Sequence, residues 1–371
     1  MTEELFLHEA MAPLLIFLVS FLLTRSENIS ATAAAGAQVP AMFVFGDSLL
    51  DPGNNNNMLS LAKADQTPNG IDFPLGTTGR FCNGGTTADY LGTHLGLPFI
   101  PPFNNPATKG PAILQGVNYA SAGSGILDDT GKVFGQVFTM DAQIQNFKAT
   151  KQELSLLLVS GTEEHITRSL FFIGAGNNDY INNYILPISE ERIKYTPEAF
   201  SDLLIQQFRR QLTELYNLGA RKFLISGIGP LGCTPYQLGY QGDDSGSCVQ
   251  STNELALMYN SKLKTMLDEY NADLRDSTVL YLDAYSLGSH IINNYSAYGF
   301  KYQNKACCGA GRSKGQIICL AFIPPCQNRS EYVFWDPYHP TDAFNIISAK
   351  EAYQGNLQAW FPRNVQQLVQ S

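Results

Sequence analysis

Short apolar segments alternate along this chain with long amphipathic ones, and this alternation constrains the fold more than any other feature. The apolar segments have the length of β-strands and are rich in β-branched and aromatic residues. They cover residues 41–45, 116–120, 170–174, 222–226 and 278–282. Strands that are separated by helices lie parallel, because each helix carries the chain back across one face of the sheet. The pattern predicts an α/β fold, with a parallel sheet of about five strands covered by helices on both faces.

The clearest amphipathic stretch begins at Pro197 and ends before Gly219, with Phe200 and Leu204 on one helical face. Proline in the first turn and glycine after the last turn are typical helix boundaries. Residues 252–274 repeat the pattern. No internal repeat or low-complexity linker divides the 371 residues. We therefore expect one large domain after the N-terminal segment.

Composition excludes one class of partner. The chain is 44% hydrophobic and 15% charged, which fits a globular protein with a large core, and its formal net charge is -9. No cluster of lysine and arginine is present, so nucleic-acid binding has no electrostatic support.

The first 37 residues have the pattern of a signal peptide. Residues 11–23 form an apolar run that is short for a membrane span, and residues 31–37 are small enough to suit signal peptidase. The ten residues before Met11 are acidic, whereas a signal peptide usually begins with basic residues. This favours Met11 as the natural start. A membrane anchor is the alternative. The sequence predicts a leader over 1–37, a domain over 38–371, and no transmembrane anchor.

Cysteines and glycosylation motifs agree with secretion. Seven cysteines follow the leader without zinc-site spacing, which in an oxidising compartment indicates disulfide bonds. Cys233 and Cys248 are expected to pair, and Cys82 is the most isolated. Asn294 and Asn328 begin Asn-x-Ser sequons and are predicted glycosylation sites. The expected location is extracellular or in the cell wall, with the vacuole as the alternative.

Polar residues follow the first three predicted strands. Ser48 follows residues 41–45, Gly123 follows 116–120, and Asn178 follows 170–174. Carboxyl ends of parallel strands share one edge of the sheet, where ligands bind in open α/β folds. A hydroxyl, a glycine N–H and an amide would therefore lie close together. Acyl transfer needs such a set, a nucleophile with donors for the developing oxyanion.

A base for the serine is found near the C-terminus. His339 lies three residues after Asp336, a spacing at which a turn brings the carboxylate to the imidazole. Each feature also has a purely structural explanation, since serines at such junctions often cap turns and glycine-rich strand ends also bind phosphate. Ser313 matches a Gly-x-Ser-x-Gly motif, but no strand precedes it, so it is rejected as nucleophile. Two long segments rich in Gly, Pro and Asn, 51–111 and 286–335, are expected to shape a pocket.

Four blocks in order resemble the plant GDSL-type esterase/lipase family of the SGNH hydrolases. They are "FVFGDSLLDPGNNN", "GVNYASAGSGI", "FFIGAGNNDY" and "FWDPYHPT". The resemblance extends from about Pro40 to the end of the chain. The second block has Ala122 where many relatives have a glycine, and it keeps Gly123.

The resemblance implies a flavodoxin-like three-layer α/β/α sandwich. It implies a catalytic triad of Ser48, Asp336 and His339. It also implies an oxyanion hole formed by the N–H groups of Ser48 and Gly123 and the side chain of Asn178. No metal or cofactor is required.

The expected activity is hydrolysis of small-molecule or lipid carboxylic esters through an acyl-enzyme. Three alternatives stay open at this point: acyl transfer to another alcohol, removal of acetyl groups from cell-wall polysaccharide, and a secreted binding role without turnover. The physiological substrate and its acyl chain length depend on the long loops and do not follow from the sequence.

Overall fold

The computed structural model describes residues 36–186, 188–274, 276–355 and 360–370. Its central sheet has five strands in the order β1-β2-β3-β4-β7. Strands β1 to β4 are parallel and pair without a register shift. Their bounds are β1 Met42–Gly46, β2 Leu170–Gly174, β3 Lys222–Ser226, β4 Thr278–Leu282 and β7 Trp360–Phe361. The expected parallel α/β sheet is confirmed, with one difference, since β7 joins β4 in the antiparallel direction.

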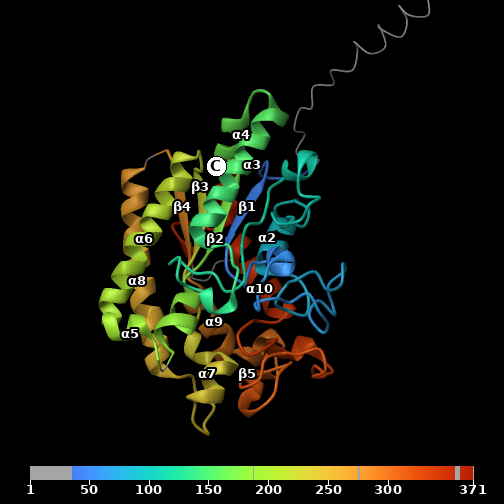
Figure 1. The fold of residues 1–371 in the computed structure, drawn as a ribbon, viewed down its shortest axis with the longest axis vertical. Helices are drawn as coiled ribbons and strands as arrows, with labels where there is room; N and C mark the ends of the chain where they lie inside the picture. Colours follow the sequence, from blue (N-terminus) through green and yellow to red (C-terminus); the bar gives the residue numbers. More distant parts are fainter. Residues whose placement is uncertain (1–35, 187, 275, 356–359, 371) are drawn as a thin grey trace, which may run out of the picture. The chain divides into compact units, whose positions relative to one another are not determined.

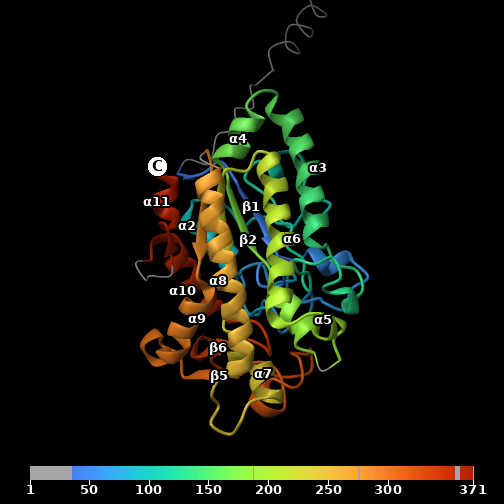
Figure 2. The ribbon, with the colours of Figure 1, turned by 90° about the vertical axis from the view of Figure 1, so that its left-hand side faces the viewer.

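Helices cover both faces of the sheet. Figures 1 and 2 show α6 and α8 over one face and α2 and α10 over the other. The α-helices are α2 Thr87–His94, α3 Met140–Leu158, α4 Thr162–Arg168, α5 Glu190–Lys194, α6 Pro197–Asn217, α7 Pro235–Tyr240, α8 Gln250–Asp273, α9 Ala284–Asn293, α10 Asp342–Gln354 and α11 Val365–Val369. The arrangement is the predicted three-layer sandwich.

Alternation along each strand builds two separate cores. In β1, Phe43 and Phe45 join a cluster that packs against α3, α6 and α8, whereas Met42 and Val44 join a second cluster against α2, α10 and α11. All four side chains have no exposed surface. Successive side chains of a strand point to opposite faces, so a strand buried on both sides must be apolar at every position.

Helix α6 begins and ends where the sequence predicts. Thr196 caps it by accepting a hydrogen bond from the N–H of Ala199, and Pro197 occupies the first turn. Gly219 follows the helix with φ +109°, a conformation that favours glycine.

One predicted strand is wrong. Residues 116–120 run beside β1, and the N–H of Tyr119 donates to the carbonyl of Val44 at 2.8 Å, but only isolated bridges form. The far side of the segment lacks a continuous partner strand. The side chain of Asn54 instead donates to the carbonyls of Asn118 and Ala120, at 2.8 and 2.7 Å.

The two long segments lie partly in regular structure. The first contains α2, and the second contains most of α9 and the parallel pair β5 Tyr302–Ala306 and β6 Tyr332–Phe334. Figures 1 and 2 both show β5 and α7 beyond the lower end of the sheet, the end at which β1 finishes. No helix among the described residues is long and apolar enough to cross a bilayer. Residues 1–35 of the predicted leader lie outside the described residues.

Candidate active site

Ser48 lies in a tight turn directly after β1. The carbonyl of Asp47 accepts the N–H groups of Leu50 and Asp51, each at 3.1 Å, which closes the turn. The carboxylate of Asp47 accepts the N–H of Leu49 at 3.0 Å and the amide of Asn177 at 3.2 Å. Burial raises the pKa of Asp47, and these hydrogen bonds oppose the rise. The turn leaves Ser48 half-buried at the carboxyl edge of the sheet.

Asp336 and His339 share a second turn, directly after β6. The carboxylate of Asp336 accepts the backbone N–H groups of Tyr338 and His339, both at 2.8 Å. The same carboxylate lies 2.8 Å from the imidazole Nδ1 of His339. This is the arrangement that the three-residue spacing predicts. The carboxylate therefore both builds the turn and orients the ring.

The two turns meet although 291 positions separate them in the sequence. The Nε2 atom of His339 lies 2.7 Å from the hydroxyl oxygen of Ser48. With the proton on Nδ1 held by Asp336, Nε2 is free to accept the hydroxyl proton of Ser48. The ring of Phe81 stands 5.0 Å from the imidazole, centroid to centroid. His339, oriented by Asp336, can thus accept the hydroxyl proton of Ser48.

The predicted oxyanion donors line the same cavity as Ser48 and His339, which has a volume of about 230 Å³. Within the described part of the chain, neither the N–H of Ser48 nor that of Gly123 has a hydrogen-bond acceptor. Gly123 has φ +84°, and a Cβ there would come within 2.7 Å of Phe134. Two unpaired backbone donors beside a serine hydroxyl are what an oxyanion hole requires.

Asn178 is held by two hydrogen bonds. Its side-chain nitrogen donates to the carbonyl of Ser124 at 2.9 Å, and its side-chain oxygen accepts from Asn182 at 2.8 Å. An amide carries two N–H groups, so one remains for a ligand. Asn178 is 9% exposed and lines the cavity.

Asp51 connects the serine turn with the segment that carries Gly123. Its carboxylate accepts the N–H groups of Gly53 and Asn54, each at 2.7 Å, and that of Ala122 at 3.0 Å. Ala122 directly precedes Gly123. The carboxylate therefore positions one candidate oxyanion donor relative to Ser48.

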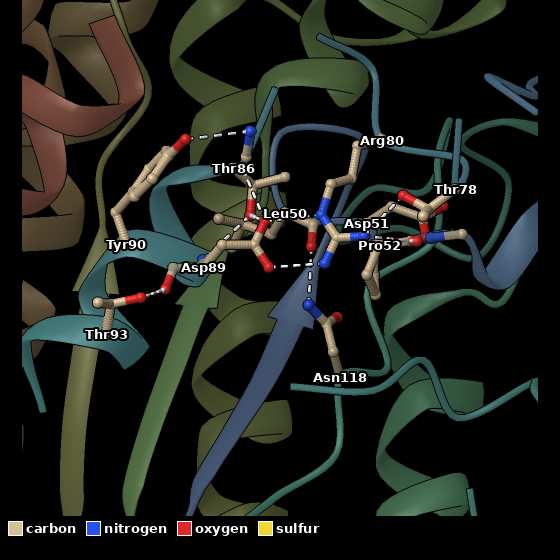
Figure 3. A network of polar contacts seen from close by, with 12 residues as sticks. Leu50, Asp51, Pro52, Thr78, Arg80, Thr86, Asp89, Tyr90, Thr93 and Asn118 are labelled. Carbon is tan, nitrogen blue, oxygen red and sulfur yellow. Dashed lines mark hydrogen bonds and ion pairs between the residues drawn. The ribbon is translucent and has the colours of Figure 1, made fainter. Parts of the chain in front are cut away.

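A buried ion pair beside Asp51, between Arg80 and Asp89, supports the position of this carboxylate (Figure 3). Arg80 binds Asp89 through two hydrogen bonds of 2.7 and 2.6 Å, and both side chains are 5% exposed. Arg80 also donates to the carbonyl of Pro52 at 3.3 Å, beside Asp51. A paired, hydrogen-bonded arginine can remain charged when buried.

The asparagines that follow Asp51 also connect the serine turn with the segment that carries Gly123. Asn54 and Asn55 are 0% and 1% exposed. Besides the contacts of Asn54 described above, the amide of Asn55 donates to the carbonyl of Ala122 at 2.9 Å. The carbonyls of Ala120 and Ala122 have no backbone donor among the described residues, and these amides satisfy them. The sequence signal was the run itself, but its partners could not be identified before folding.

We expect buried Asp51 to make a contribution to the free energy of unfolding that depends on pH. Burial raises its pKa to about 6 from 3.8, and its N–H donors oppose the rise. The folded protein then holds this proton more tightly than the unfolded chain does. Its contribution is full below pH 4 and is lost as the pH rises through 6.

We expect Asp51→Asn to lower the free energy of unfolding more at pH 4 than at pH 7, by up to about 3 kcal/mol. Urea unfolding of both proteins at the two pH values measures this difference. Because the other titrating groups are common to both proteins, their effects cancel. A larger loss at pH 7 would contradict the raised pKa.

Three disulfides involve six of the seven cysteines. The predicted Cys233–Cys248 bond is confirmed, and Cys82 is buried and unpaired, as expected. The remaining bonds join Cys307 with Cys326 and Cys308 with Cys319. Cys319 lines the cavity of Ser48. These two bonds therefore fix the loop that forms one wall of the site.

The structure brings Ser48, Asp336, His339, Gly123 and Asn178 to one cavity. Ser313 lies in the short helical turn Arg312–Lys314 rather than between a strand and a helix, which agrees with its rejection. The sequon residues Asn294 and Asn328 are both exposed.

Comparison with known proteins agrees with this geometry. The family model described as GDSL-like Lipase/Acylhydrolase matches residues 42–352. A GDSL esterase/lipase of Arabidopsis thaliana is 48% identical over 333 residues, covering 89% of this chain and 86% of that protein. Two further GDSL esterase/lipases of the same plant are 44% identical, covering 95% and 96% of this chain and 92% and 98% of their own lengths.

Proposed function

Because this chain belongs to the GDSL-like lipase/acylhydrolase family and is a carboxylic ester hydrolase, we propose that Ser48, His339 and Asp336 form its catalytic triad. The observation that carries the proposal is the hydrogen-bonded chain from the hydroxyl of Ser48 through both ring nitrogens of His339 to Asp336. This chain lies in a cavity beside unpaired backbone donors. It supports acyl transfer through a serine nucleophile.

Hydrolysis would proceed in two steps. The hydroxyl oxygen of Ser48 attacks the ester carbonyl while Nε2 of His339 accepts the hydroxyl proton. The tetrahedral intermediate collapses, His339 gives that proton to the leaving alcohol, and the acyl group remains on Ser48. Water then attacks the acyl-enzyme, with His339 again as base, and releases the carboxylic acid and free Ser48. Asp336 keeps its hydrogen bond to Nδ1 of His339 and stabilises the imidazolium.

The oxyanion would be held by the N–H groups of Ser48 and Gly123 and the free amide N–H of Asn178. These donors are fixed before the reaction, by the serine turn, by Asp51 through Ala122, and by the hydrogen bonds of Asn178. Donors that need no rearrangement stabilise developing charge most effectively.

Asn178→Ala is expected to lower kcat by roughly 10²- to 10³-fold, because one of three oxyanion donors is removed. KM should change little, since the donor acts mainly on the tetrahedral oxygen. Steady-state kinetics on one p-nitrophenyl ester measures both constants. Asn182→Ala is the matched control: it removes the hydrogen bond that holds Asn178 but not the donor, so a smaller loss is expected. Unchanged kcat in Asn178→Ala would exclude Asn178 from the oxyanion hole.

The same site would act outside the cytoplasm. Three disulfides and two exposed sequons support passage through the secretory pathway. Expression of the full chain in plant cells, N-terminal sequencing of the secreted protein and endoglycosidase treatment test this. A secreted protein that begins near residue 38 and shifts in mass is expected. Retention in the cell at full length would contradict it.

Hydrolysis of p-nitrophenyl esters, together with labelling by a serine-directed fluorophosphonate, tests the proposed function. One probe per chain should attach to the peptide that contains Ser48, and activity should disappear in parallel. Activity should persist in EDTA. Turnover that survives complete labelling of Ser48 would refute the proposal. Ester products formed with added alcohols would indicate acyl transfer beside hydrolysis.

A further inference from the structure

A second cavity adjoins the candidate active site, on the α9 and α10 face of the sheet. Its volume is about 150 Å³, and it lies at the carboxyl ends of β2, β3 and β4. Phe172, Leu282, Ile292, Phe334 and Phe344 form much of its wall. Nothing in the hydrolytic scheme uses this space.

Five residues line both cavities and form the partition between them: Leu49, Asn177, Leu231, Thr234 and Tyr338. Leu49 directly follows Ser48, and Tyr338 directly precedes His339. The partition therefore flanks the nucleophile and its base. The second cavity therefore lies directly beside the cavity that holds Ser48.

The second cavity is suited to a group without charge or polar atoms. Among the residues that line it, none is an aspartate, glutamate, lysine, arginine or histidine. Most of its polar side chains already have partners: for example, Thr234 donates to the carbonyl of Leu231 at 2.8 Å, and Asn345 donates to that of Gly85 at 2.9 Å. Within the described residues, no buried side-chain nitrogen or oxygen that lacks a partner lines this cavity. An apolar cavity of this size holds a benzene-sized guest.

The residues that line the two cavities differ in their exposure. The cavity of Ser48 includes Leu61 and Ile318, which are 83% and 55% exposed. Every residue that lines the second is buried or half-buried, and Phe172 and Leu282 are 2% and 3% exposed. During catalysis the alcohol must leave and water must enter, while the acyl group stays on the serine. The cavity lined in part by exposed side chains fits the alcohol, and the apolar cavity without them fits the acyl group.

We propose that the cavity between the ends of β2–β4 and helices α9 and α10 is the acyl-binding compartment of this hydrolase, with room for an aliphatic or aryl acyl group of about six carbons. This inference rests on the proposed function. It assigns the substrate class as esters of medium-chain or aromatic carboxylic acids.

Gly229 allows a direct test. It lines the second cavity, its φ lies outside the left-handed region, and no atom lies within 4 Å of a Cβ placed there. Gly229→Leu should fill the compartment, and Gly229→Ala controls for the loss of backbone freedom. Phe344→Ala should enlarge it, because Phe344 is a half-buried wall residue.

The measurement is kcat/KM for p-nitrophenyl esters from acetate to decanoate, expressed relative to acetate for each protein. In the wild type this ratio should rise roughly fourfold per methylene up to about six carbons. Gly229→Leu should lower the hexanoate ratio by roughly tenfold or more, Gly229→Ala should have a much smaller effect, and Phe344→Ala should move the optimum to longer chains. An effect of a substitution on the chemistry at Ser48 changes kcat/KM for all the esters alike. Dividing each value by that for acetate removes this effect and leaves the contribution of the acyl chain.

Chain-length profiles that coincide in the wild type, Gly229→Leu and Phe344→Ala would overturn the assignment. The assignment would also be overturned if the substitutions changed kcat/KM according to the alcohol of acetate esters and not according to the length of the acyl chain. If Gly229→Leu does not fold, the chain-length profile of Phe344→Ala alone tests the assignment. Turnover in Ser48→Ala would instead contradict the proposed function, so the two failures are distinguishable.

Discussion

Ser48→Ala and His339→Ala are each expected to lower kcat by about 10⁶-fold, because nucleophile and base act as one unit. Their atoms lie 2.7 Å apart, and within the described residues no other histidine lines the cavity. The double variant should be no slower than either single one. The residual rate comes from binding and the oxyanion donors alone.

Ser313→Ala is the control for this experiment. Ser313 satisfies the Gly-x-Ser-x-Gly pattern but lies in a helical turn that does not line the cavity. The variant should retain the wild-type kcat. If Ser313→Ala abolished activity and Ser48→Ala did not, the nucleophile would have been misassigned.

Asp336→Asn should lower kcat by about 10⁴-fold with little change in fold. The asparagine oxygen can still accept the N–H groups of Tyr338 and His339, which keeps the turn. Its NH₂ group would then face Nδ1 of His339, which can accept a hydrogen bond only without its own proton. The proton moves to Nε2, and His339 loses its capacity to accept the proton of Ser48.

Steady-state kinetics together with thermal unfolding separates this effect from misfolding. Asp342→Asn is the matched control, since Asp342 accepts the N–H of Gly85 at 2.7 Å and does not line the cavity of Ser48. It should lower the melting temperature while changing kcat far less than Asp336→Asn does. Equal losses of kcat in the two variants would contradict the orienting function of Asp336.

The sequence predicted the local parts of the fold and the candidate site. Apolar strands, the boundaries of α6 and the turn from Asp336 to His339 depend on interactions between near neighbours. The convergence of Ser48, Gly123 and Asn178 followed from the rule that parallel strands finish at one edge. The convergence of Ser48 with His339 followed from the family resemblance. The Cys233–Cys248 pair also spans only a short separation.

What the sequence did not predict depends on distant partners. Residues 116–120 have strand composition, but their far side makes only an isolated bridge, at Pro102 and Asn118, and hydrogen bonds with the side chain of Asn54. The partners of Cys307 and Cys308 depend on how their loop folds. The raised pKa of Asp51 comes from burial that no local pattern reports. The second cavity combines residues from β2, β4, α9 and α10, so only the folded chain defines it.

Trapping the acyl-enzyme tests the central claim most directly. The wild-type protein is mixed with excess p-nitrophenyl hexanoate, quenched in acid during turnover, digested and examined by mass spectrometry. The account predicts a hexanoyl group on the peptide that contains Ser48, which is absent in Ser48→Ala. Turnover accompanied by a hexanoyl group on another residue would contradict the proposed mechanism.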